Sequence, residues 1–385
     1  MIHPDRVSHV NWSGENVSLD EVLYQVNRLR SEFASQGAGD YELPHPRNSV
    51  MNLVVVAADE GDAQRAANVA EMLGTQHPSR TIVVEPVLKP GDRIDAAIQA
   101  HAHELVDSAP IQYEEIRLRV WGSRARLRSL VEPLLAPDVL THLWWLGTPP
   151  WDAEAFREVL PGINTLVVDS SDFDRPYEGF LALSEIADNL QPYQGVADFE
   201  WVRLHPWREA LAQAFAPAGR VQLLRGIGAV GLDYAGEGRA NRASVALMAG
   251  WLIDRLEWAL HDASAKHSGL VQAHYRAPSG HAVEIAARSV QVEGGGVADG
   301  TLLALRLEGA GGGHTLHAEL MRDRLEMNRA SLTLEVGEEE PLRHDVPLGD
   351  SEDAEVLSTL LVLGRRDPVY LRSLRKASEL LQAFQ

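Results

Sequence analysis

The stretch that decides the fold is Val50–Ala58, VMNLVVVAA, an apolar run dominated by β-branched residues. Such a run predicts a buried strand. Residues Asp62–Leu73 follow with helical periodicity and end at Gly74, which predicts a helix closed by a glycine cap. A further strand is predicted over Thr81–Glu85. Strand, helix and strand in this order form a βαβ unit, whose right-handed crossover lays two parallel strands side by side.

The same alternation continues on both sides of this unit. Upstream, Ser18-Leu-Asp-Glu21 is a capping box that predicts the start of a helix. Downstream, hydrophobic periodicity predicts strands at Arg93–Val106, Ile111–Trp121, Val139–Leu146 and Asn164–Val168, and helices at Ala125–Leu135 and Ala153–Val159. The alanines of the first of these strands also suit a helix. We therefore expect an α/β domain with a mainly parallel sheet over residues 1–172.

Beyond Asp172 the pattern changes. Periodicity and turn signals predict helices at Tyr177–Asn189, Phe199–Phe215 and Arg242–Leu260, an extended segment at Arg220–Tyr234, short strands over Leu270–Val336, and helices at Ser351–Leu363 and after Asp367-Pro368. Residues 173–385 are thus expected to form an α+β domain with a long central helix, an antiparallel meander and packed helices.

Composition excludes several classes of function. The chain has 385 residues, a formal net charge of −20 and no cysteine. Without cysteine, the chain has no disulfide, no thiolate nucleophile and no Cys-ligated metal. The negative charge argues against binding to nucleic acid or to anionic membranes. The longest apolar stretch, Ala243–Leu260, is interrupted by charged residues, and no targeting segment is evident, so we expect a cytoplasmic protein.

No residue pattern indicates catalysis. Gly226-Ile-Gly-Ala-Val-Gly231 matches G-x-G-x-x-G, but the next predicted helix begins only near Arg242, so we interpret the glycines as a flexible or bulged strand. The pairs His101/His103 and His314/His317 have no carboxylate at a metal-binding spacing. We therefore expect no catalytic residue, no cofactor and no metal ligand.

Two groups of residues are candidates for contact with a partner. Five arginines within 12 residues surround Trp121, and they suit a clamp for phosphates or carboxylates, a docking patch for an acidic partner, or a solvated face with local ion pairs. Two adjacent tryptophans close a predicted strand and point to opposite faces, so one is expected in the core and the other as an exposed anchor. The candidates are Arg117, Arg119, Arg124, Arg128, Trp144, Trp145 and Trp151.

Five motifs in sequence order resemble the OpcA family, the glucose-6-phosphate dehydrogenase assembly proteins. They are His77-Pro-Ser-Arg80, Leu143-Trp-Trp-Leu-Gly-Thr-Pro149, Leu204-His-Pro-Trp-Arg208, Ala249-Gly-Trp-Leu-Ile-Asp-Arg-Leu-Glu-Trp258 and Gly364-Arg-Arg-Asp-Pro-Val-Tyr370. The resemblance implies a non-catalytic partner that assembles or activates glucose-6-phosphate dehydrogenase in the oxidative pentose phosphate pathway. It also implies thiol-linked control in cyanobacterial relatives, for which a chain without cysteine is not itself the sensor.

A different class of function stays open at this point. The chain is alternatively a sugar-phosphate or nucleotide-binding enzyme, or a metabolite-sensing regulator, that uses the arginines between Arg117 and Arg128. Either alternative requires those guanidinium groups to be available to a ligand.

Overall fold

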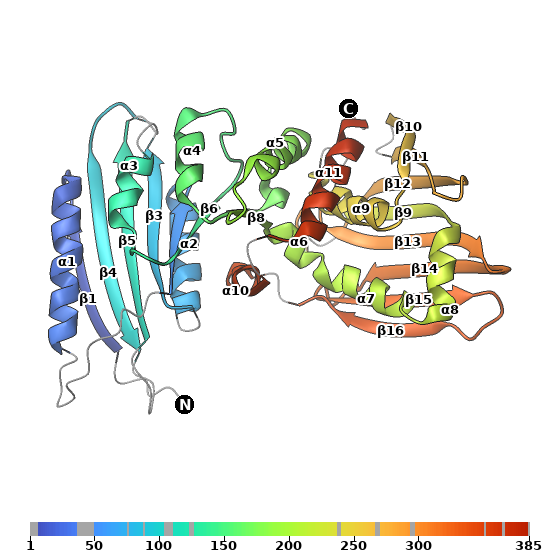
Figure 1. The fold of residues 1–385 in the computed structure, drawn as a ribbon. Helices are drawn as coiled ribbons and strands as arrows, with labels where there is room; N and C mark the ends of the chain where they lie inside the picture. The colour runs from blue at the N-terminus through green and yellow to red at the C-terminus, as the bar shows by residue number, and fades with distance from the viewer. Residues whose placement is uncertain are drawn as a thin grey trace. The chain divides into compact units, whose positions relative to one another are not determined.

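The computed structural model describes residues 7–36, 50–74, 77–87, 89–103, 111–122, 127–236, 240–265, 270–292, 297–349, 352–363 and 366–383. The chain forms two compact units (Figure 1). Unit 1 contains Met1–Val168 and Gln191–Ala197, and unit 2 contains Asp169–Leu190 and Asp198–Gln385. That residues 1–172 and 173–385 are separate domains stays a prediction.

Unit 1 is an eight-stranded sheet with helices. Its strands are β1 (Val7–Gly14), β2 (Met51–Val56), β3 (Ser79–Val87), β4 (Ile94–His103), β5 (Ile111–Trp121), β6 (Leu140–Trp145), β7 (Thr165–Val168) and β8 (Gly195–Asp198), and its helices are α1 (Leu19–Gln36), α2 (Glu60–Gly74), α3 (Leu127–Val131) and α4 (Glu154–Val159). The strand order is β1-β4-β5-β3-β2-β6-β7-β8. The pairs from β5 to β7 are parallel, whereas β1 and β4 pair antiparallel. The mainly parallel sheet is confirmed.

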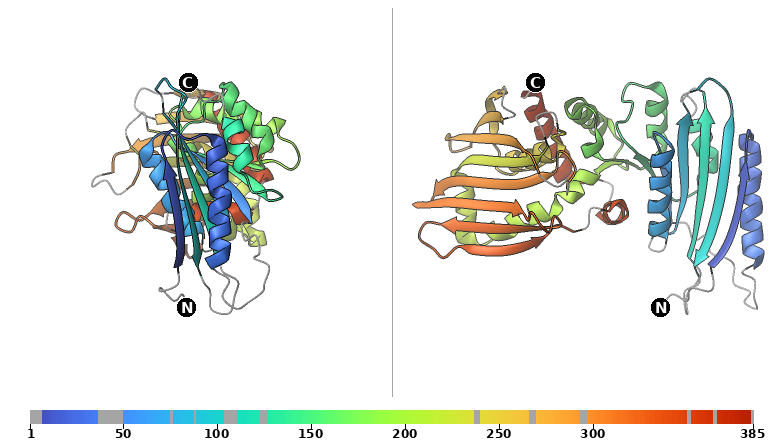
Figure 2. Two further views of the ribbon diagram at one scale, coloured as in Figure 1. Left: turned by 90° about the vertical axis from the view of Figure 1, so that its left-hand side faces the viewer. Right: turned by 180° about the vertical axis from the view of Figure 1, so that it is seen from behind.

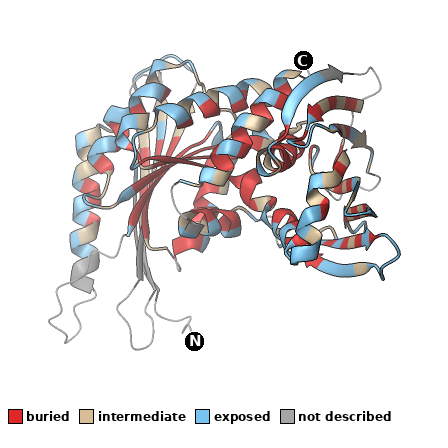
Figure 3. Ribbon diagram, turned by 45° about the vertical axis from the view of Figure 1, so that its right-hand side comes forward, coloured by how far each residue is buried: buried red, intermediate tan, exposed pale blue. Residues whose placement is uncertain are grey.

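The core of unit 1 lies on both faces of the central strands. Every residue of β2 is buried, and the central parallel strands are red in Figure 3. Polar contacts place helices on opposite faces, because Arg30 of α1 pairs with Glu114 while Gln64 of α2 accepts a hydrogen bond from Arg117. Positions 114 and 117 of β5 point to opposite sides of the sheet. A strand covered on both sides has no polar face, which explains the continuous apolar run that starts at Val50.

Unit 2 is a second eight-stranded sheet with packed helices. Its strands are β9 (Ile227–Ala235), β10 (Ala259–Ala265), β11 (Leu270–Arg276), β12 (Ala282–Val290), β13 (Leu302–Gly311), β14 (His314–Arg322), β15 (Arg329–Val336) and β16 (Leu342–Pro347), and its helices are α5 (Pro176–Asn189), α6 (Phe199–Arg203), α7 (His205–Phe215), α8 (Ala218–Val221), α9 (Ala243–Arg255), α10 (Asp353–Leu363) and α11 (Pro368–Ala383). The order is β10-β11-β12-β9-β13-β14-β15-β16, and the β9–β12 pair alone among these is parallel. The predicted α+β arrangement with an antiparallel meander is confirmed.

Alternation of side chains fixes which face of this sheet is covered. Along β15 buried and exposed residues alternate, as in a strand with one face against the core. Figure 1 shows α7, α8 and α9 in front of the sheet, and Figure 2 shows the strands from behind. Helices α9 and α11 cross closely at Gly250, where an added Cβ would lie 2.3 Å from the backbone oxygen of Ser373. No helix that the structure describes is both long and apolar enough to cross a membrane.

Local predictions were confirmed where side chains cap helices. Ser18 Oγ accepts a hydrogen bond from the backbone N–H of Glu21 at 3.2 Å, as the capping box predicts. Asp367 Oδ1 accepts from the N–H groups of Val369 and Tyr370 at 2.8 and 3.1 Å, which caps α11. Both caps satisfy N–H groups that have no partner within the helix.

Four predictions about elements were wrong. The helix predicted over Phe199–Phe215 is two helices, since Pro206 has no backbone N–H to continue the hydrogen bonds of the first helix. Residues 218–226 are helical rather than extended, and the strand starts at Ile227. The long helix ends at Arg255, so Leu260 belongs to β10. Strand β1 was not predicted, because its residues alternate with His, Asn and Ser and its partner is β4.

The end of α9 gives a first testable prediction. Glu257 adopts a φ of +56°, a left-handed conformation that L-residues with a Cβ rarely take. Glu257→Gly should raise the free energy of unfolding by roughly 0.5–1 kcal/mol, because glycine takes this conformation without strain. Urea unfolding followed by circular dichroism measures the change. Glu257→Ala is the control: it removes the same side chain but keeps the strain, so an equal gain in both variants would contradict this explanation.

Candidate functional site

The carboxyl edge of the parallel strands in unit 1 is where a ligand is expected. The order β5-β3-β2-β6-β7-β8 is that of a doubly wound dinucleotide-binding sheet, and its two halves meet between β2 and β6. In such sheets the pyrophosphate lies against the N-terminus of the helix that follows the first strand of the unit. In this chain that helix is α2.

The N-terminus of α2 is occupied by the chain's own carboxylates. Asp59 Oδ1 accepts a hydrogen bond from the backbone N–H of Asp62 at 3.0 Å, and Asp62 Oδ2 accepts from the N–H of Ala58 at 3.2 Å. Glu60 lies in the same turn, 3.7 Å from the guanidinium of Arg119. Asp59 thus takes one of the N–H groups of the first turn of α2, and the charge of these three carboxylates repels a phosphate. A dinucleotide does not fit this edge.

Tryptophans fill the space beside β6. Trp144 and Trp145 are 0% and 6% exposed, so the expectation that one of them is an exposed anchor is wrong. Both are buried because helices and loops cover both faces of this central strand. The ring of Phe156 in α4 contacts Trp145 edge-on, with centroids 5.1 Å apart, and contacts Trp151 at 5.8 Å. Trp151 is half-buried. A contact of these tryptophans with a partner stays a prediction.

A small cavity remains next to Trp145. It measures about 40 Å³, and residues at the carboxyl ends of four strands line it together with α3, α4 and the loop before α4. Every lining residue is apolar or a glycine, including Val56, Val84, Trp145 and Phe156. Apart from the indole N–H of Trp145, the lining side chains offer no hydrogen-bonding group to a sugar or a phosphate.

The arginines around Trp121 are held by acidic partners. Arg117 pairs with the buried carboxylate of Glu115, and Arg119 lies 3.0 Å from Glu85. Arg128 pairs with Glu132 one helical turn away at 3.1 Å. Arg124 lies outside the described residues. Among the three interpretations, the geometry favours a solvated face with local ion pairs. Contact of these arginines with a partner remains a prediction.

The glycines of the G-x-G-x-x-G motif lie in or next to strand β9 of the sheet of unit 2. Gly228 and Gly231 lie within β9, as the interpretation as a strand predicts. A Cβ on Gly226 would lie 1.9 Å from the backbone oxygen of Ala310, so glycine is needed there for the close approach of two backbones. No helix starts within this motif, and therefore the glycines do not form a phosphate cradle.

The histidine pairs do not form a metal site in the described part of the chain. His314 and His317 lie on β14, and His317 Nδ1 is 3.9 Å from Glu308. The side chains of His101 and His103 lie outside the described residues. Among the described side chains, no group of three His, Asp or Glu residues is arranged to hold a metal ion.

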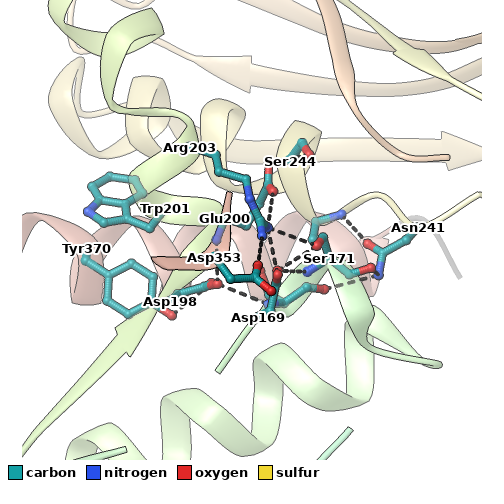
Figure 4. A network of polar contacts seen from close by, with 12 residues as sticks. Asp169, Ser171, Asp198, Glu200, Trp201, Arg203, Asn241, Ser244, Asp353 and Tyr370 are labelled. Carbon is teal, nitrogen blue, oxygen red and sulfur yellow. Dashed lines mark hydrogen bonds and ion pairs between the residues drawn. The ribbon is translucent and has the colours of Figure 1, made fainter. Parts of the chain in front are cut away.

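A buried polar network in unit 2 brings several charged groups together (Figure 4). Asp198 caps α6 and accepts hydrogen bonds from the N–H groups of Ser170 and Glu200, both at 3.0 Å. The hydroxyl of Tyr370 in α11 donates to Asp198 Oδ2 at 3.2 Å. Asp198 therefore joins three segments of unit 2 that are distant in sequence.

Arg203 is the cation of this network. Its guanidinium lies 2.7 Å from Asp169, 3.5 Å from Glu200 and 3.6 Å from Asp353. Ser244 Oγ in α9 donates to Glu200 at 2.6 Å, which brings a further helix into the network. Burial acts to lower the pKa of Arg203, but the surrounding carboxylates outweigh burial and raise it.

The network holds more carboxyl groups than cations, and the pKa values of two of these carboxyl groups are raised. Burial, followed by repulsion from Asp169, raises the pKa of Asp198 to about 7. Burial also raises the pKa of Glu200. A carboxyl group with such a pKa exchanges its proton near neutral pH. The network can therefore hold or release a proton. Its hydrogen bonds and ion pairs also connect α6, α9, α10 and α11 to residues 169–173.

Two motifs quoted in the sequence analysis meet beside this network. Arg208 donates to the backbone oxygen of Trp201 at 2.8 Å, and its guanidinium carbon lies 3.3 Å from the centroid of that ring. Burial lowers the pKa of Arg208 to about 9. Trp201 Nε1 donates to Asp367 Oδ2 at 2.9 Å. The Leu204–Arg208 and Gly364–Tyr370 motifs thus position the helices of unit 2.

Sequence reasoning missed Asp169, Asp198, Glu200 and Arg203. In a chain with 55 acidic residues, a carboxylate pair is no signal by itself. A usable signal was the position of Asp198, which ends the strand β8 and immediately precedes the helix α6, because an Asp at such a junction is a helix cap. Burial of the group depends on helices that come later in the chain, and no local pattern reports them.

Comparison with known proteins gives matches along most of the chain. The family model described as glucose-6-phosphate dehydrogenase subunit N-terminal domain matches residues 70–185, and the corresponding C-terminal domain model matches residues 194–374. The OxPP cycle protein OpcA of Synechococcus elongatus is 30% identical over 251 residues, which are 63% of this chain and 54% of that protein. OpcA of Nostoc punctiforme is 30% identical over 247 residues, 62% of this chain and 51% of that protein. The chain thus spans about half the length of these relatives.

Solved structures share the fold at low sequence identity. An oxidoreductase from Sinorhizobium meliloti is 13% identical, with a TM-score of 0.50 over 86% of this chain and 97% of that chain. A super-repressor mutant of Gal80p from Saccharomyces cerevisiae is 7% identical, with a TM-score of 0.50 over 87% of this chain and 96% of that chain. At this identity the likeness concerns the fold alone.

Proposed function

The chain belongs to the OpcA family of glucose-6-phosphate dehydrogenase subunits, and from this membership we propose that it is a non-catalytic partner that assembles with and activates that dehydrogenase. The match to two domain models of a dehydrogenase subunit, in order along the chain, carries the proposal. We place the protein in the cytoplasm, with the dehydrogenase rather than nucleic acid or a membrane as its partner.

The geometry of unit 1 supports a non-catalytic role. The fold resembles that of an oxidoreductase, but the phosphate position at α2 holds Asp59, Glu60 and Asp62. Trp145 and Phe156 reduce the crevice beside β6 to a small apolar cavity. The alternative, an enzyme or metabolite sensor that uses the arginines near Trp121, requires guanidinium groups that carboxylates of the chain already engage.

Activation without chemistry in this chain follows from differential binding. If the dehydrogenase exists in less and more active assemblies, a partner that binds the active assembly more tightly increases its population. A difference of about 1.4 kcal/mol in binding free energy changes the ratio of the two assemblies tenfold. The negative charge of the chain also favours oriented encounter with a basic surface, and the association rate should fall as salt rises.

Mixing the purified chain with its cognate dehydrogenase tests the proposal. We expect light scattering to detect a complex, and we expect the rate of NADP reduction per dehydrogenase to rise on addition of the chain. The chain alone should give no turnover of glucose 6-phosphate or 6-phosphogluconolactone. An unrelated acidic protein of similar charge is the control for nonspecific effects. Absence of a complex at micromolar concentrations would contradict the proposal, and turnover by the chain alone would favour the enzyme alternative.

A further inference from the structure

The apolar cavity at the carboxyl edge of unit 1 occupies the place where doubly wound sheets bind their ligand. It is lined by residues at or near the carboxyl ends of β2, β3, β5 and β6 and by Leu127, Leu130 and Phe156 of α3 and α4. The parallel strands fix one wall, and these helices fix the other. The cavity is therefore part of a rigid framework, which favours binding without reorganisation.

The chemistry of the walls selects the ligand. A sugar phosphate or nucleotide requires several polar or charged partners, whereas the lining side chains carry no charge and only one hydrogen-bond donor, the indole N–H of Trp145. The volume of about 40 Å³ is roughly three times what one water molecule needs. This space suits a single branched aliphatic side chain rather than a metabolite. Burial of such a side chain contributes about 1.5–3 kcal/mol.

The rim of the cavity is acidic among the described residues. Asp152 and Glu154 are exposed next to the lining residues Ala153 and Ala155, and Asp152 is paired with Arg157 at 3.1 Å. Across the same edge, Asp59 and Glu60 are exposed at the start of α2, three and four residues after the lining residue Val56. Arg157 and Arg119 offset part of this charge, because they pair with Asp152 and Glu60. The described carboxylates still outnumber these two guanidinium groups, so cationic groups beside the apolar group of a ligand complement the rim.

We propose that this cavity, with its acidic rim, receives an aliphatic side chain flanked by lysine or arginine on the surface of the dehydrogenase. A protein segment satisfies both the apolar wall and the charged rim, whereas a second copy of this chain, at −20, is repelled by the first. The inference rests on the proposed function and names the surface through which unit 1 contributes to it.

Filling the cavity tests the inference. Ala155 lines the cavity from α4, and Ala155→Leu adds three aliphatic carbon atoms toward it while keeping a good helix former. We expect the dissociation constant for the dehydrogenase, measured by titration calorimetry, to rise at least tenfold. Ala182→Leu is the matched control, because Ala182 is also half-buried on a helix, α5, and does not line the cavity. Thermal melting of each variant shows whether it remains folded.

A second variant acts on the rim without entering the cavity. Glu154→Lys should slow association at low salt and reduce the dependence of the association rate on salt, as measured by stopped flow. If the unaltered chain binds the dehydrogenase, and Ala155→Leu and Glu154→Lys bind it as tightly and as fast as the unaltered chain, the inference is overturned while the proposed function stands. If the unaltered chain does not bind the dehydrogenase, the proposed function fails, and this inference fails with it.

Discussion

Asp198→Asn should give the chain a higher free energy of unfolding than the unaltered protein at pH 8, and this difference should become smaller as the pH falls toward 4. The pKa of Asp198 is raised from 3.8 to about 7 in the folded chain by burial and by repulsion from Asp169. Between these values the folded chain holds a proton that the unfolded chain has released. The free energy of unfolding therefore falls as pH rises through this window and levels off above it.

The size of this effect follows from the shift in pKa. At about 1.4 kcal/mol per unit, the raised pKa corresponds to a loss of stability on the order of 4 kcal/mol between pH 4 and pH 8. Asparagine is neutral in both states and keeps an oxygen that accepts from the N–H groups of Ser170 and Glu200. The part of the pH dependence of the free energy of unfolding that comes from residue 198 is therefore lost in the variant. The part that comes from Glu200, whose pKa is also raised, remains.

Urea unfolding at pH 5, 6, 7 and 8 measures the difference in free energy of unfolding between Asp198→Asn and the unaltered protein. Asp345→Asn is the control, because Asp345 is exposed on the outer strand β16 and the same substitution there removes the charge without burial. A difference that stays constant with pH would show that Asp198 does not exchange its proton in this range. A variant less stable than the unaltered protein at pH 8 would show that the network stabilises the charged carboxylate.

Gly250→Ala should lower the free energy of unfolding by about 3 kcal/mol, because it forces apart the two helices that cover the second sheet. A Cβ at this position of α9 would lie 2.3 Å from the backbone oxygen of Ser373 and 2.8 Å from the backbone nitrogen of Ala377 in α11. Both atoms belong to helix backbone, so the overlap is relieved only by a shift of the helix. The strain exceeds the gain of about 1 kcal/mol that alanine brings within a helix.

Gly219→Ala provides a matched control for this prediction. Gly219 also lies in a helix, α8, but a Cβ there meets no atom within 4 Å. The same substitution should leave stability unchanged or raise it slightly. Thermal unfolding followed by circular dichroism compares the two variants. Equal stability of both would show that α9 and α11 separate at little cost.

The sequence predicted elements that local chemistry determines. The run from Val50, the cap at Ser18 and the cap at Asp367 each depend on residues within a few positions, and all three were confirmed. Strand β1 was missed because its pairing partner lies about 90 residues away in sequence. The end of α9 was missed because Glu257 takes a conformation that favours glycine.

The candidate site was predicted less completely than the fold. Adjacent tryptophans on a strand point to opposite faces, as expected, but burial of both depends on what covers each face, and α4 covers one of them with Phe156. The arginines near Trp121 were found by their density, whereas the carboxylate partners of Arg119 come from β3 and α2, which are distant in sequence. Asp198 lies in a network assembled from five segments, none of which is unusual in sequence.

The position of β9 bears on how unit 2 folds. Strands β13 to β16 each pair with the next strand in the chain, so they can form one after another as hairpins. Strand β9 instead pairs with β12 in the register Ala229 to Glu284 and with β13 in the register Leu232 to Leu305. The chain between β9 and these strands must lose conformational entropy before their hydrogen bonds form, and this cost slows folding. We therefore expect β9 to have both edges unpaired during synthesis until β12 and β13 have been synthesised, and its exposed edges to favour aggregation in that interval.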